Sequence, residues 1–129
     1  MFQKELGDRI IGEFKKKGYG RLSIITNYRM KIINKFLVSP NCFSPKPKVK
    51  SMVIHFQPKE NLNFQIKDIN SLEKVTNNFF SNKRKMINKT ILKFSRKDEI
   101  LKINGLNPNL RPEEINPEIY YKISEIIAK

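Results

Sequence analysis

The residues best suited to chemistry lie in a proline-rich segment, Asn41–Val49, whose sequence is NCFSPKPKV. Proline restricts the backbone, so the segment can present one aromatic ring, Phe43, beside two cations, Lys46 and Lys48. An aromatic face next to positive charge can stack an unpaired nucleic-acid base and hold its phosphate. The alternative is that Phe43 fills a gap in the core while the prolines only cross between two strands. The residues alone leave both interpretations open.

Other candidate chemistry in the chain is weak. Gly18 and Gly20 begin a G-x-G pattern, but Ser23 stands where a dinucleotide loop needs its last glycine, and no strand precedes the pattern. One cysteine, Cys42, and one histidine, His55, are too few for an internal disulfide or a protein-only zinc site. His55 alternates within an apolar run, which favours a packed core histidine. We therefore predict no self-contained catalytic site and no structural metal, in a reducing cytosol.

Charge is the strongest compositional signal. The 129 residues contain 26 Lys plus Arg against 12 Asp plus Glu, for a net charge of +14 and a pI near 10.0. A lysine-rich proteome would raise the number of lysines, but it need not exclude acidic residues locally. Two long stretches, 14–59 and 74–97, have no acidic residue at all. Their basic residues are Lys15, Lys16, Lys17, Arg21, Arg29, Lys31, Lys35, Lys46, Lys48, Lys50 and Lys59, then Lys74, Lys83, Arg84, Lys85, Lys89, Lys93, Arg96 and Lys97. A polyanion such as nucleic acid is the expected partner.

The elements that must position these residues differ between the two halves. Apolar spacing predicts helices over 5–14 and 19–28, the second burying Leu22, Ile24 and Ile25. Residues 30–38 and 51–56 are rich in β-branched and aromatic types and predict two strands.

Beyond Pro58 the pattern is helical only. Apolar residues recur at helical spacing over 66–79, 86–94 and 119–127, with Asn116 as a predicted N-cap and Pro117 at the first helical position. The expected fold is thus α/β followed by a small all-α domain, divided into 1–58 and 59–129.

The second predicted strand also indicates whether the predicted sheet is complete. Met52, Val53, Ile54 and Phe56 form a nearly continuous apolar run, typical of a strand covered on both faces. Since a lone hairpin is marginally stable in water, we expect further strands from residues upstream of Met1 in a longer parent, or from a partner chain. No run approaches the roughly 20 apolar residues of a membrane span, and the charged N-terminus is unlike a signal peptide, so we expect a cytoplasmic protein.

Several short motifs in order along the chain resemble those of the ribosomal RNA adenine dimethyltransferases. Phe43–Ser51 resembles the F-x-P-x-P-K-V-x-S loop of that family. The other similar segments are Gln3-Lys4-Glu5 with Asp8-Arg9, Tyr19-Gly20-Arg21-Leu22-Ser23, Phe80 with Asn82-Lys83-Arg84-Lys85, and Gly105-Leu106-x-Pro108 followed by Arg111-Pro112-Glu113. Lys83 replaces the first Arg of R-R-K, and Pro112 replaces Ala. The last motif points to the small-subunit branch, and away from the antibiotic-resistance methylases of large-subunit RNA.

The resemblance implies a function and a division of labour. The fold implied is the C-terminal part of a Rossmann-like methyltransferase sheet, followed by a helical RNA-binding domain. Phe43 would stack on the flipped target adenine of small-subunit ribosomal RNA. Phosphates would be contacted by Arg21, Lys46, Lys48, Lys83, Arg84 and Lys85. The glycine-rich loop and N-L-P-Y loop that serve S-adenosylmethionine and the target amine would lie upstream of Met1, so we expect the full-length enzyme to bind the cofactor and this chain alone to be inactive.

Two other functions are weighed against this one. A stand-alone, non-catalytic RNA-binding or ribosome-associated module descended from the enzyme would show the same basic stretches, and the coding sequence upstream of Met1 would discriminate. A domain for anionic membranes is less well supported, because no predicted helix combines a basic face with a broad exposed apolar one.

Overall fold

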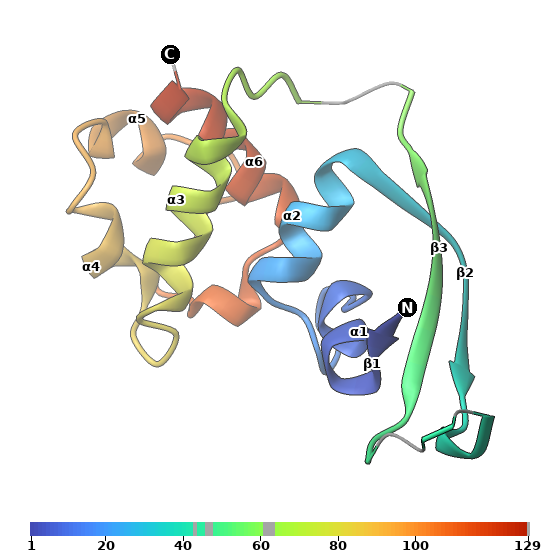
Figure 1. Ribbon diagram of the computed structural model, residues 1–129. Coiled ribbons are helices and arrows are strands. Elements are labelled where there is room, and N and C mark those ends of the chain that lie inside the picture. Colours follow the sequence, from blue (N-terminus) through green and yellow to red (C-terminus); the bar gives the residue numbers. More distant parts are fainter. Residues whose placement is uncertain (43, 46–47, 61–63, 129) are drawn as a thin grey trace.

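The computed structural model describes residues 1–42, 44–45, 48–60 and 64–128, and consists of a small antiparallel sheet with helices beside it (Figure 1). The first half of the chain supplies the sheet, α1 (Lys4–Ile10) and α2 (Arg21–Arg29). The second half supplies α3 (Ile69–Phe80), α4 (Ile87–Ile91), α5 (Lys97–Leu101) and α6 (Pro117–Ala128). In Figure 1 the sheet and α1 lie on one side, α3 to α6 on the other, and α2 between them.

The sheet has three strands in the order β1-β3-β2, namely β1 (Phe2–Gln3), β3 (Ser51–Pro58) and β2 (Met30–Val38). Both long strands confirm the sequence prediction. They pair antiparallel, with Phe36 opposite Val53, and the register shifts between Ile32 and Asn34. The central strand, β3, also pairs with β1 through Phe2 and Gln3.

The two faces of the sheet differ in how they are covered. Met52 is only 5% exposed because α1 packs over it. The contact is so close that a Cβ added to Gly7 of α1 would lie 2.6 Å from the Met52 sulfur. Phe36, by contrast, is 55% exposed. Full cover on both faces, which the apolar run predicts, is therefore not seen over the described residues.

The prediction that His55 is a core residue is wrong, because its side chain is exposed. Side chains alternate along a strand, so His55 points to the face opposite Met52 and shares that face with Val53 and its neighbour Phe36. Burial in β3 follows the position of α1, which the apolar alternation alone could not reveal.

The helical half has a compact apolar core. Leu72, Val75 and Phe79 of α3 are fully buried against Tyr120 and Ile123 of α6. Their spacing of three and four residues gave the predicted helices, and α3, α4 and α6 are confirmed.

The start of α6 agrees with the expected cap, since the Asn116 side-chain oxygen accepts the Glu118 backbone N–H at 3.0 Å and Pro117 is the first helical residue. The short helix α5 was not predicted. Only one of its residues, Ile100, is fully buried, which leaves too little periodicity to detect.

The helix α2 contributes to this same core. Ile24 is fully buried and Tyr28 nearly so, and both belong to the cluster formed by α3 and α6. The Tyr28 hydroxyl donates to the Phe64 carbonyl and accepts the Ile66 N–H, each at 3.0 Å. The core therefore extends across residue 58, while the division into 1–58 and 59–129 stays a prediction.

The predicted burial of Leu22 is wrong, since this residue is 41% exposed. Ser23, Ile24 and Tyr28 define the buried face of α2, and Leu22 projects to the side. That side borders the groove described next.

Candidate nucleic-acid interface

A large open groove lies between the sheet side of the molecule and the helical half. Its volume is about 1380 Å³. Its walls are formed by α1, the loop 11–20, the start of α2, Lys35 of β2, Val49 and Lys50 before β3, and Phe80 with Lys83 at the end of α3. All five segments that resemble family motifs thus contribute residues to one groove, the last of them through Glu113.

The loop 11–20 is shaped by two glycines. Helix α1 ends at Ile10, earlier than the predicted residue 14, and the chain then folds back so closely that a Cβ on Gly12 would lie 2.2 Å from the Gly18 carbonyl oxygen. Gly18 has φ +95°, a conformation that side chains disfavour. This close backbone contact requires glycine and sets the floor of the groove.

A tyrosine anchors the end of this loop to the helical half. The Tyr19 hydroxyl donates to the Ile115 carbonyl at 2.7 Å, and burial raises the pKa of Tyr19 well above its usual range. Ser23 then closes the first turn of α2, because its hydroxyl accepts the Gly20 N–H at 3.1 Å and donates to the Gly20 carbonyl at 2.9 Å. Arg21 is therefore held at the groove by bonds on both sides.

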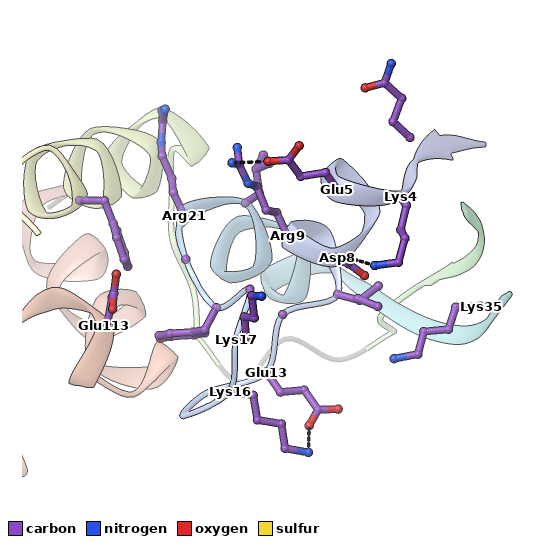
Figure 2. Close-up of a pocket in the computed structure, with 18 of the residues that line it drawn as sticks. Lys4, Glu5, Asp8, Arg9, Glu13, Lys16, Lys17, Arg21, Lys35 and Glu113 are labelled. Atoms are coloured by element: carbon purple, nitrogen blue, oxygen red, sulfur yellow. Dashed lines mark hydrogen bonds and ion pairs between the residues drawn. The ribbon is translucent and has the colours of Figure 1, made fainter. Parts of the chain in front are cut away.

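The groove carries an excess of positive charge. It is lined by eight cationic side chains and four carboxylates. Three of the carboxylates are engaged by near neighbours in ion pairs, which Figure 2 draws as dashed lines: Lys4–Asp8 at 2.8 Å, Arg9–Glu5 at 3.2 Å and Lys16–Glu13 at 2.8 Å. Among the described residues, the groove cations without an ion pair are Lys17, Arg21, Lys35, Lys50 and Lys83.

The pair between Glu13 and Lys16 keeps both groups charged. The hydrogen bond and charge of Lys16 lower the pKa of Glu13, with a smaller contribution from Lys35, and Glu13 in turn raises the pKa of Lys16. Such exposed pairs add little stability. Their effect is to occupy carboxylates that would otherwise repel an anion in the groove.

A second, smaller hollow of about 430 Å³ lies beyond the end of α3. Four cations line it, namely Arg84, Lys85, Lys89 and Arg111. Its one carboxylate, on Glu114, accepts the Arg111 backbone N–H at 3.1 Å and so caps the turn η2 (Pro112–Glu114). This hollow is also suited to an anion.

The predicted site residues fall into three groups. Arg21 and Lys83 line the large groove together, and Arg84 and Lys85 line the smaller hollow. Lys48 is exposed and lines neither of them. Phe43 and Lys46 lie outside the described residues.

Three cations of the groove are not among the residues that the family resemblance assigns to phosphate contacts. Lys17, Lys35 and Lys50 belong to the acid-free stretch 14–59, so the signal was present. Nothing in their spacing indicates that a loop, an edge strand and the residue before β3 face the same groove.

Neither a metal site nor a membrane-spanning helix is found within the described residues. No group of three or more His, Cys, Asp or Glu side chains is placed to hold a metal ion. No helix within these ranges has the length and apolar character required to cross a bilayer.

A basic groove beside a small sheet and a helical half is a surface suited to a polyanion. The profile of the family described as "Ribosomal RNA adenine dimethylase" matches residues 1–129, and the chain belongs to this family.

Curated relatives include the ribosomal RNA small subunit methyltransferase A of Pelagibacter ubique, 43% identical over 95% of this chain, and that of Buchnera aphidicola, 35% identical over 100% of this chain. In both cases the chain spans 47% of the relative, about half its length.

Solved structures share the fold. A dimethyladenosine transferase from Plasmodium falciparum superposes with a TM-score of 0.75 at 21% identity, over 95% of this chain and 53% of that one. The 23S rRNA methyltransferase ErmE superposes with a TM-score of 0.60 at 19% identity, over 98% and 52% of the two chains. At these identities the likeness concerns the fold.

Proposed function

We propose that this chain is the RNA-holding portion of a cytoplasmic, S-adenosylmethionine-dependent adenine dimethyltransferase that acts on small-subunit ribosomal RNA. In this proposal residues 1–58 are the last helices and strands of a Rossmann-like catalytic sheet, and residues 59–129 are the helical RNA-binding domain. The family match over the whole chain supports the class of enzyme.

Each predicted site residue has a physical role in the proposal. Phe43 stacks on the flipped target adenine and holds the base while its amine reacts. The cations that contact phosphates are Arg21, Lys46, Lys48, Lys83, Arg84 and Lys85. Stacking orients the base, and phosphate contacts fix the register of the strand.

The observation that carries the proposal is the meeting of Arg21 and Lys83 in one groove. They are separated by nearly half of the chain, yet both line the same groove and neither has an ion pair among the described residues. Paired carboxylates beside them leave a net positive surface, which attracts a phosphate backbone.

In the full enzyme S-adenosylmethionine supplies the methyl group. The groove does not fit this cofactor, because its sulfonium and ammonium groups outnumber its one carboxylate and the groove already has excess cations. We propose that other parts of the enzyme bind the donor, and that this chain alone transfers no methyl group.

Fluorescence anisotropy with a short, labelled, adenine-containing single-stranded RNA tests the proposal. The chain should bind with strong salt dependence, and the double variant Arg21→Gln/Lys83→Gln should lower the slope of log affinity against log salt by about 1.4, at about 0.7 per lost phosphate contact. The matched control is Lys93→Gln/Lys102→Gln, which removes the same charge from exposed positions outside both hollows.

Isothermal titration with S-adenosylmethionine tests whether the donor site lies outside this chain. We expect no tight, stoichiometric binding to this chain. Such binding would refute the proposed location of the donor site, whereas an absence of RNA binding would refute the proposed function.

A further inference from the structure

Three groove cations stand at none of the fixed positions of the motifs that the family resemblance rests on, since Lys50 occupies a variable position of Phe43–Ser51. Lys17, Lys35 and Lys50 are exposed, line the large groove, and have no ion pair among the described residues. They come from three separate elements: the loop 11–20, β2, and the residue before β3. Their convergence is a property of the fold.

Two of these lysines, Lys35 and Lys50, are held by backbone pairing. The Lys50 carbonyl accepts the Lys4 N–H at 2.9 Å, which ties the start of β3 to α1. Lys35 lies within the β2–β3 ladder opposite Ile54. Figure 2 shows Lys35 projecting from β2 toward the groove, and its charge is close enough to lower the pKa of Glu13.

The lysines lie between two regions that the proposed function assigns to RNA. Val49, the last residue of the Asn41–Val49 segment that carries Phe43, and Lys50, which follows it, both line the groove. Phe80 and Lys83 line it from the end of α3. The groove therefore leads from the segment expected to hold the base to the helical half.

The walls also offer apolar surface between the cations. Leu22 is 41% exposed, Val49 is 48% exposed, and Phe80 is partly exposed in the same groove. Alternating charge and apolar surface suits an unpaired strand, whose bases need partners that a duplex would already have satisfied.

We propose that Lys17, Lys35 and Lys50 form a phosphate track for the single-stranded RNA on the side of the target adenine that continues toward Lys83. This inference rests on the proposed function. It adds three contact residues to that function and specifies that the bound RNA is unpaired. The track positions the backbone, and the Phe43 segment holds the base.

The test compares two double variants of the whole chain with equal charge loss. Lys35→Gln/Lys50→Gln removes two track cations, and Lys93→Gln/Lys102→Gln removes two exposed cations elsewhere. Anisotropy with labelled single-stranded RNA between about 50 and 300 mM salt should show a slope lower by about 1.4 for the first pair and unchanged for the second. Lys35→Arg/Lys50→Arg should restore the slope of the parent chain.

The outcomes separate this inference from the proposed function. The phosphate track is overturned if Lys35→Gln/Lys50→Gln and Lys93→Gln/Lys102→Gln give the same salt slope while Arg21→Gln/Lys83→Gln still lowers it. That result leaves the proposed function standing. If Lys35→Gln/Lys50→Gln lowers the salt slope equally for a labelled RNA duplex of the same length, the assignment to an unpaired strand is overturned. An absence of salt-dependent RNA binding by the parent chain overturns both.

Discussion

The Tyr121 hydroxyl in α6 donates a 2.7 Å hydrogen bond to the Ile24 carbonyl in α2, joining residues 97 positions apart in the chain. Tyr121 is 7% exposed and Ile24 is fully buried, so water has little access to this bond. With the Tyr19 and Tyr28 bonds, it attaches the segment that carries Arg21 to the helical half. The position of Arg21 relative to Lys83 therefore depends on buried tyrosine hydroxyls.

Replacing Tyr121 by Phe should lower the free energy of unfolding by about 1–3 kcal/mol, because the buried Ile24 carbonyl loses its partner while the ring remains. Urea denaturation measures the change, and near-ultraviolet circular dichroism checks that the ring still packs. A free energy of unfolding equal to that of the parent chain would contradict this account of the bond.

Alkaline pH should destabilise the fold through buried tyrosines. Burial raises the pKa of both Tyr120 and Tyr121 above the ordinary value near 10. Below pH 10 both states hold these protons and stability is complete; above it the unfolded chain loses them first, so stability falls. The expected loss is up to about 1.4 kcal/mol per pH unit for each tyrosine. Urea titrations at pH 9 and pH 11 measure it, and Tyr121→Phe should reduce the pH dependence.

Gly12 and Gly20 make a matched pair for the loop that borders the groove. Gly12→Ala should cost about 1–3 kcal/mol, because the new Cβ meets the Gly18 backbone at 2.2 Å. Gly20→Ala should be nearly neutral, since no heavy atom lies within 4 Å of its added Cβ and its φ of 178° is extended. Thermal unfolding of both variants gives the comparison. Equal melting temperatures would mean that the loop relaxes freely.

Phe43→Ala should weaken binding of single-stranded, adenine-containing RNA by about 1–3 kcal/mol if the ring stacks on a base. Leu92→Ala is a control, because Leu92 is 60% exposed and lines neither hollow. Unchanged affinity accompanied by reduced stability would return Phe43 to the role of a core-filling residue.

Sequence patterns predicted most of the secondary structure and part of the candidate interface. The helices α2, α3, α4 and α6 follow from apolar spacing, because each buries residues on one face. The two long strands follow from their β-branched and aromatic composition. His55 and Leu22 were placed wrongly for one reason: the covering element, α1 or the helical core, decides which face is buried. Local periodicity does not contain that information.

The convergence at the groove was likewise beyond local patterns. Separate family motifs indicate Arg21 and Lys83, and their meeting depends on α2 packing against α3. Lys35 lies in no motif and Lys50 stands at a variable position of one. Only the antiparallel register of β2 with β3 and the bond from Lys4 bring them to the same surface.

The burial of Ile24 and Tyr28 among the later helices has a practical consequence for exchanging parts between relatives. A chimera joined at residue 59 would replace α3 and α6 but keep a foreign α2 in their core, with two apolar side chains unmatched. A junction before Tyr19 would carry α2 with its helical neighbours and preserve the bond from Tyr19 to Ile115. By this criterion the unit to exchange begins at α2, within the first half of the chain. The strands β2 and β3, which follow α2 in the sequence, are then an insertion between α2 and the helices it packs against.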